Sequence, residues 1–193
     1  MSNGTEVFRQ FTSVKLSNGK AVNLRALGIG DFANIEQEAL RLYRRDMIRT
    51  WTDNVDLMPT DKANEWIHDA FTRAEKISLN DLPSKTIIQH HPDDMEKPAD
   101  DRRVLRVITN APYANYWMGE EVDGQIYSIW LAARHDTPGV TIADIDDLFR
   151  DDEGRLSEAD LHLVAQTLGE LSAPKIAGNG QAPHRRRRKR GRG

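Results

Sequence analysis

Residues 126–149 read IYSIWLAARHDTPGVTIADIDDLF and carry the strongest hydrophobic pattern in the chain. Apolar side chains recur at helical spacing over residues 126–134, which predicts a helix whose broad apolar face lies in the core. A Pro-Gly pair ends that helix, and Thr141 followed by Asp144 is typical of a capping box that opens a second, short helix. We expect the second helix to point its apolar side chains inward: Ile142, Ile145, Leu148 and Phe149.

A β-hairpin is expected near the N-terminus. Residues 11–16 and 20–25 alternate apolar with polar side chains on either side of Asn18-Gly19, a pair that accepts the positive φ angles of a tight hairpin turn. One hairpin alone is marginal in water, so its apolar side must be covered. Either the chain's own helices cover this side, which we favour, or a partner chain covers it through strand exchange. The side chains concerned are Val14, Leu16, Val22 and Leu24.

Two longer helices follow the hairpin. The periodicity predicts them over residues 32–51 and 60–77, with Asp31 and Thr60 as their N-caps. The first helix carries four arginines opposite its apolar face, and these either form a solvated surface, which we favour, or bind an acidic partner. They are Arg41, Arg44, Arg45 and Arg49. The second helix has an apolar stripe made of Ala63, Trp66, Ile67, Ala70, Phe71, Ala74 and Ile77.

The middle of the chain is less regular. Residues 78–103 hold three prolines and are predicted to form a loop, and residues 102–108 are compatible with a strand or a helix. A helix is expected after Pro112, and a last one, capped by Ser157 together with Asp160, ends near residue 172. The predicted fold is therefore mainly α with an N-terminal β-hairpin (α+β). We expect a flexible segment over residues 1–10, a helical domain over 11–172 and a disordered basic tail over 173–193.

Composition limits the classes of function. The chain has 193 residues, no cysteine, 38% hydrophobic and 30% charged residues, which excludes disulfides and thiolate chemistry and fits a reducing compartment. Seven of the 27 basic residues lie in residues 185–193, which leaves 20 basic against 30 acidic residues, a net charge of −10, for the rest. The first 25 residues lack the pattern of a secretory signal, and no apolar run approaches a membrane span. We expect a soluble protein that is not exported and does not enter membranes.

Three segments resemble chemical sites only in part. Gly28-Ile29-Gly30 lacks the third glycine of a dinucleotide loop, and Pro92 splits the His and Asp residues of 90–94, so a solvated acidic loop is favoured over a metal site. Residues 149–160 match a calcium loop except that Phe149 stands where the first ligand, an aspartate, is required. No GxSxG or HExxH motif occurs. We therefore expect no enzymatic activity, no cofactor and no metal.

The basic tail is a candidate for binding phosphates or an acidic partner. Such a run attracts nucleic acid by charge but reads no sequence, and without interleaved aromatic residues it is weak evidence for a dedicated nucleic-acid protein. It can equally bind the acidic body of a neighbouring copy. The residues are Arg185, Arg186, Arg187, Arg188, Lys189, Arg190 and Arg192.

Over residues 12–28 and about 120–172, the order of motifs resembles the tail assembly chaperones of long-tailed bacteriophages. The motifs are VKLSNGKAVNLRAL at residues 14–27, then Gly-Asp-Phe and a helix, IWLAAR at 129–134, TPGVTIADIDDLF at 137–149 and a closing leucine-rich helix. The resemblance implies a small helical protein, made in the cytoplasm of the infected host cell. It also implies binding of the tape-measure protein, or another tail protein, during tail morphogenesis.

If the resemblance holds, the mechanism is binding without chemistry, in which apolar side chains shield the hydrophobic helices of a client. The candidate contact residues are Trp117, Tyr127, Trp130 and Phe149, although the same side chains are also the best candidates for the core. We also expect self-association. The alternative is a structural or packaging protein of a phage, whose arginine-rich tail contacts nucleic acid non-specifically.

Overall fold

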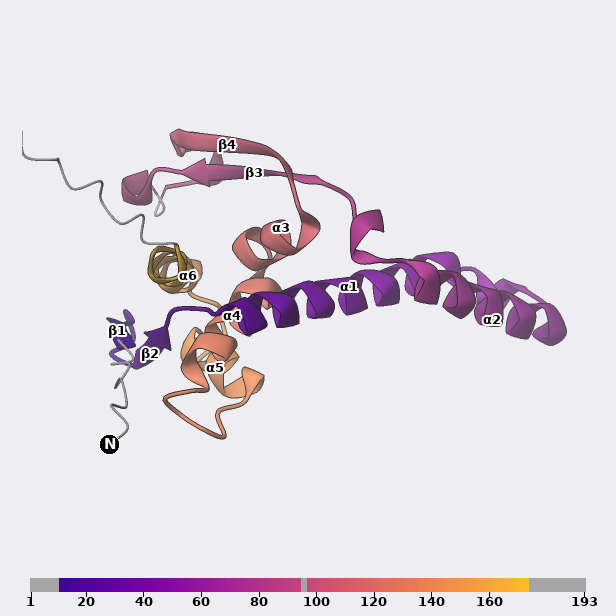
Figure 1. Ribbon diagram of the computed structural model, residues 1–193, viewed down its shortest axis with the longest axis horizontal. Helices are drawn as coiled ribbons and strands as arrows, with labels where there is room; N and C mark the ends of the chain where they lie inside the picture. The colour runs from indigo at the N-terminus through magenta and orange to yellow at the C-terminus, as the bar shows by residue number, and fades with distance from the viewer. Residues whose placement is uncertain (1–10, 95–96, 174–193) are drawn as a thin grey trace, which may run out of the picture.

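The computed structural model describes residues 11–94 and 97–173 (Figure 1). The fold is mainly α with an N-terminal β-hairpin, as predicted, and it includes a second two-stranded antiparallel sheet. The strands are β1 (Phe11–Lys15), β2 (Ala21–Arg25), β3 (Lys85–His90) and β4 (Val104–Ala111). The helices are α1 (Ile29–Trp51), α2 (Thr60–Lys76), α3 (Tyr113–Glu120), α4 (Val122–Ala133), α5 (Ile142–Leu148) and α6 (Glu158–Ser172). The segments expected to be flexible, 1–10 and all but the first residue of 173–193, lie outside the described residues.

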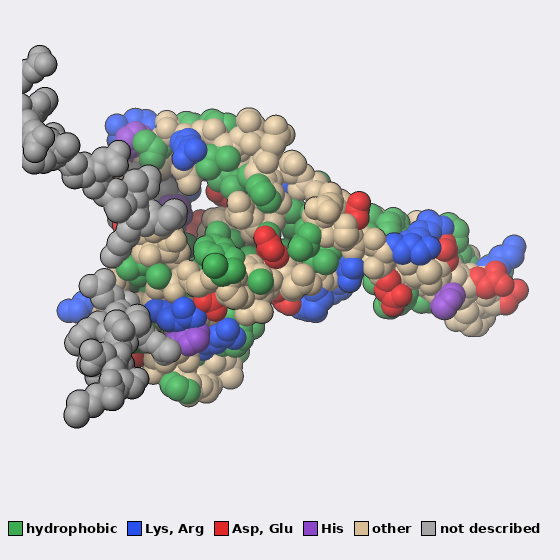
Figure 2. All heavy atoms as spheres, in the orientation of Figure 1, with side chains coloured by type: hydrophobic (Ala, Val, Ile, Leu, Met, Phe, Trp, Pro, Cys, Tyr) green, Lys and Arg blue, Asp and Glu red, His purple; other side chains and the backbone are tan. Residues whose placement is uncertain are grey.

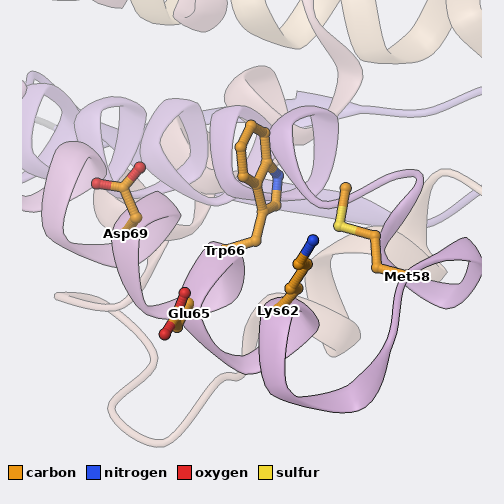
Figure 3. Close-up of a pocket in the computed structure, with 5 residues that line it drawn as sticks. All are labelled: Met58, Lys62, Glu65, Trp66 and Asp69. Atoms are coloured by element: carbon orange, nitrogen blue, oxygen red, sulfur yellow. The ribbon is translucent and has the colours of Figure 1, made fainter.

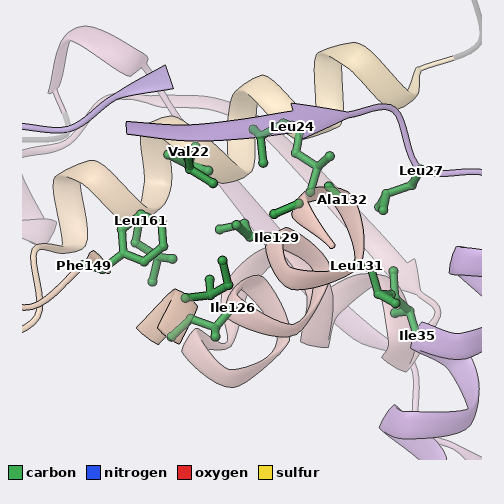
Figure 4. Packing of buried hydrophobic residues seen from close by; sticks show 14 of the residues in the cluster. Val22, Leu24, Leu27, Ile35, Ile126, Ile129, Leu131, Ala132, Phe149 and Leu161 are labelled. Atoms are coloured by element: carbon green, nitrogen blue, oxygen red, sulfur yellow. The ribbon is translucent and has the colours of Figure 1, made fainter. Parts of the chain in front are cut away.

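Helix α4 is the centre of the core, as the pattern of residues 126–134 predicts. It contacts β2, α1, α3, α5 and α6, and its Ile129, Leu131 and Ala132 are completely buried (Figure 4). The β1–β2 hairpin packs its apolar side against this helix and α6, which confirms the favoured interpretation that the hairpin is covered by the chain's own helices. Most of the short helix α5 also points inward as expected, except that Ile142 is exposed.

A buried carboxylate fastens the hairpin turn to α6. Ser17 donates hydrogen bonds to Asp160 from its backbone N–H (3.0 Å) and from its hydroxyl (2.6 Å). The Ser157 hydroxyl also donates to Asp160 (3.0 Å) and, as the predicted N-cap, accepts from the Asp160 N–H. One side chain therefore both completes a helix cap and satisfies the polar groups of a turn that is distant in the sequence.

The start of α1 differs from the prediction. The helix begins at Ile29 with Gly28 as N-cap, and Asp31 lies three residues later, where its carboxylate accepts from the Gly28 N–H (2.9 Å). Asp31 is therefore not the N-cap itself but binds the N-cap residue, because a carboxylate at the third helical position can reach back to the free N–H at the cap. Asp31 is buried and also binds Arg25 (2.7 Å) and Arg134 (3.5 Å), so it links β2, α1 and α4.

The segment 78–103 is not a loop throughout, because it contains β3. The prolines do not prevent the strand, since Pro83 precedes it and Pro92 follows it. Residues 102–108, which the pattern left undecided, supply most of β4, and the two strands form an antiparallel ribbon. A smaller correction concerns α2, whose N-cap is Pro59 and whose first helical residue is Thr60.

Candidate interaction surfaces

Helices α1 and α2 form an antiparallel arm that extends from the body of the molecule (Figure 1). Arg44 of α1 holds the end of α2, because its guanidinium donates to the carbonyl oxygen of Ile77 (3.0 and 2.5 Å) and to that of Glu75 (3.1 Å). The last carbonyls of a helix lack partners within the helix, and a cation there also complements the helix dipole. Arg44 is therefore a structural residue of the arm, not a solvated one.

The arm leaves part of its apolar surface uncovered. Ala70 and Ala74 of α2 are buried, whereas Trp66 and Phe71 of the same predicted stripe are 43% and 51% exposed. One neighbouring helix covers only the centre of a broad apolar stripe, so side chains on its flanks remain in contact with water. The Trp66 indole is fixed by donating to the carbonyl oxygen of Trp51 (2.6 Å). Near the same end of the arm, Leu57 is also exposed.

A depression lies on the arm beside Trp66. Its volume is about 470 Å³, and it is lined by Met58, Lys62, Glu65, Trp66 and Asp69 (Figure 3). Met58 and the indole supply apolar surface, and the other three side chains supply charges of both signs. Such an arrangement suits contact with an amphipathic side chain of another protein, whose apolar part can rest on the indole while its polar end meets the rim.

The β3–β4 ribbon presents a second apolar surface. One face is covered, since Ile87 and Ala111 are buried and β3 packs on α3. Other apolar side chains of the ribbon are 45–55% exposed, and we call them together the ribbon surface: Ile88, Val104, Leu105 and Val107. Ile88 and Val107 lie directly opposite one another in the register. Hydrophobic side chains are visible along both the ribbon and the arm in Figure 2.

The tip of the ribbon is held by ion pairs. Asp94 is buried and accepts from the Arg103 side chain (2.6 and 3.1 Å), the Arg103 N–H (3.1 Å) and Lys97 (2.7 Å). Hydrogen bonds from Arg103 and then from Lys97 lower the pKa of Asp94 well below its usual range. Asp94, one of the possible metal ligands in residues 90–94, is therefore already bound by two cations, Arg103 and Lys97.

The loop that resembles a calcium site has a different geometry. Phe149, at the position of the first ligand, is completely buried in the core. Asp151 accepts from the N–H (2.8 Å) and the guanidinium (2.9 Å) of Arg155, and Asp160 is bound to Ser17. Across residues 11–94 and 97–173, no group of three or more His, Asp or Glu side chains is arranged to hold a metal ion.

The four aromatic residues predicted as partner contacts lie mainly in the core. Trp117 and Phe149 are buried, so their rings are not accessible to a partner in this structure. Tyr127 and Trp130 are half-buried and continue a row of rings from Trp117, with centroid separations of 5.7 and 5.5 Å. The Trp130 indole donates to the carbonyl of Val140 (2.9 Å). The contact of Trp117 with Tyr127 joins α3 to α4, and the rings of Tyr127 and Trp130 remain only partly exposed.

The predicted basic residues, Arg185 to Arg190 and Arg192, lie outside the described residues. The periodicity groups Trp66 and Phe71 on one helical stripe but does not indicate that they are exposed. It does not distinguish a strand from a helix over residues 104–108, where apolar side chains on both sides of Arg106 are compatible with a strand.

Comparison with known proteins adds no family to this description. No family model, no curated protein and no solved structure matches the chain. Within the described part of the chain, no helix is both long and apolar enough to cross a membrane.

Proposed function

We propose that this protein is a non-enzymatic assembly chaperone, which binds another protein through exposed apolar side chains. One observation carries the proposal: large hydrophobic residues remain exposed on both parts that project from a closed core, the arm and the ribbon. These residues are Leu57, Trp66, Phe71, Ile88, Val104, Leu105 and Val107. Exposed apolar side chains that lie together are typical of sites that bind proteins, and on the ribbon Ile88 and Val107 are directly paired.

The proposed client is the tape-measure protein of a long-tailed bacteriophage, and the proposed place of action is the cytoplasm of the infected cell. Support for this finer statement comes from the resemblance of residues 12–28 and 120–172 to tail assembly chaperones. A client with long apolar helices would place its apolar face on the arm beside Trp66, where the exposed indole and the charged rim meet both parts of an amphipathic helix.

Co-expression with the tape-measure protein tests the proposal. We expect the full chain to keep that protein in solution and to co-purify with it. We expect Trp66→Asp to lose most of this binding, because a charge replaces the exposed ring at the depression. Leu163→Asp is the matched control, since Leu163 is similarly exposed (47%) but lies on α6. Equal binding by both variants, or none by the wild type, would contradict the proposal.

A second candidate function rests on the arginine run of residues 185–190. A structural or packaging protein would bind random double-stranded DNA with an affinity that falls steeply with salt, because each neutralised phosphate releases counterions. Deleting residues 184–193 would abolish that binding. DNA binding that is absent at low salt, or that survives the deletion, excludes this alternative.

A further inference from the structure

We propose that the outer edge of β4 pairs with the same edge of a second copy of this chain. The two ribbons then join into a four-stranded antiparallel sheet about a two-fold axis. This inference names the surface through which the chain associates with itself, and it does not depend on the identity of any client.

The edge is open and accessible. Within the described residues, β4 is hydrogen-bonded only to β3, so its other edge presents unpaired backbone N–H and C=O groups. The ribbon is attached to the body through the contact of β3 with α3. Figure 1 shows β4 as the outermost strand, farther from α3 and α6 than β3. A second copy on this edge would therefore have its body on the opposite side, without overlap.

The two edges of the ribbon differ in how well they are protected against pairing. Natural edge strands avoid association through charges, prolines and polar residues. Strand β3 has four polar or charged residues out of six and is flanked by Pro83 and Pro92. Strand β4 is longer, contains no proline and no acidic residue, and has one charged side chain, Arg106, although register shifts against β3 interrupt it on either side of residues 106–108. The open edge of β4 is thus the one suited to strand addition.

The stability of the ribbon also favours an additional strand. An isolated two-stranded sheet is marginal in water, and three or more strands are needed for independent stability. Apolar side chains occur on both faces of this ribbon, as they do in strands inside larger sheets. Pairing with a second ribbon doubles the number of strands and removes water from the strand edge around Val107, which is exposed in the single copy.

Charge and burial select one register. Centring the two-fold axis on Arg106 would place two guanidinium groups opposite each other, which is unfavourable. Centring it on Ile108 would pair Arg106 with Asn110, whose φ of 56° is not that of an extended strand. Centring it on Val107 pairs residues 106–108, the regular stretch of β4 between its two register shifts, and places Arg106 opposite Ile108. Because the strand pair is short, we expect its area to lie at or below the lower limit for specific interfaces, about 1,200 Å², and the dimer to be weak and concentration-dependent.

Charge substitutions at the axis test this arrangement. In the proposed dimer each Val107 meets its own copy, so Val107→Glu and Val107→Lys each place like charges in contact and should weaken dimerisation at least about tenfold in sedimentation equilibrium. An equimolar mixture of the two variants should restore the dimer, because opposite charges then meet. Restoration also shows that both variants are folded. The control is Ile142→Glu, on an exposed residue of α5, which should leave dimerisation unchanged.

A cysteine provides an independent readout, since the chain has none of its own. Directly opposed residues in antiparallel strands have Cα atoms about 4.5–5.5 Å apart, within the range of a disulfide. Val107→Cys should therefore give a covalent dimer on mild oxidation, and Ile142→Cys should not. The proposal is overturned if the wild type stays monomeric at all concentrations. It is also overturned if the dimer is insensitive to charge at position 107, or if both cysteine variants cross-link equally.

Discussion

The close approach of α3 and α4 at Gly124 gives the sharpest test of the packing. A Cβ atom added at Gly124 would lie 2.9 Å from Cδ2 of Trp117, 2.5 Å from its carbonyl carbon and closer still to its carbonyl oxygen. The nearest atoms belong to the backbone and to a buried ring, so neither can move without displacing α3. We expect Gly124→Ala to cost about 3 kcal/mol through overpacking, partly offset by a gain of about 1 kcal/mol in helix propensity.

The net loss of about 2 kcal/mol corresponds to a decrease in Tm of about 4–8 °C for a chain of this size. Gly169→Ala is the matched control, because Gly169 is also helical and an added Cβ meets nothing within 4 Å. That variant should be equally stable or up to about 1 kcal/mol more stable. Thermal unfolding followed by circular dichroism measures both variants. If Gly124→Ala is as stable as Gly169→Ala, the described contact between α3 and α4 is incorrect.

Three further predictions concern buried or half-buried polar groups. Asp160→Ala should destabilise the protein by about 1–3 kcal/mol in urea denaturation, because it leaves the Ser17 N–H and hydroxyl unpaired, whereas Asp152→Ala, on an exposed residue, should have no effect. Because its pKa is lowered in the folded state, ionised Asp94 adds to the free energy of unfolding, and this stabilisation is lost as pH falls from about 3.8 through the folded-state pKa. Asp94→Asn should accelerate hydrogen exchange at the ribbon tip already at neutral pH. The pKa of His162 is lowered by burial first and then by the charges of Arg102 and His90. The free energy of unfolding should therefore decline as pH falls below about 6.5. His162→Gln should reduce that decline, and an unchanged pH profile of the variant would contradict the prediction.

Local chemistry made the hairpin and the N-caps of α5 and α6 predictable, but not those of α1 and α2. The turn is built from Asn18-Gly19, with Gly19 at a φ of 81°, a conformation that few other residues adopt. The capping box of Thr141 and Asp144 is present as expected, with the Thr141 N–H donating to the carboxylate (2.8 Å). These features depend on residues that are neighbours in the sequence, so no knowledge of the tertiary fold is required.

The interaction surfaces were harder to predict because they depend on which elements meet. Periodicity placed Trp66 and Phe71 on one apolar stripe, but it does not show that a single helix covers only the middle of that stripe. Likewise, aromatic composition identified Trp117 as a candidate contact, whereas its burial follows from the close approach of α3 and α4 at Gly124. The pairing of β3 with β4 required the register across the acidic tip, which periodicity alone does not supply.

The bond between Ser17 and Asp160 joins the first element of the domain to the last, and this has a consequence during synthesis. The ribosome makes the hairpin about 130 residues before α6, an interval of roughly 7–26 s at ordinary elongation rates. Until then, the apolar side of the hairpin lacks one of its two covering helices, and the nascent chain cannot close its core. Truncated products that stop before residue 158 should therefore be substrates for cellular proteases.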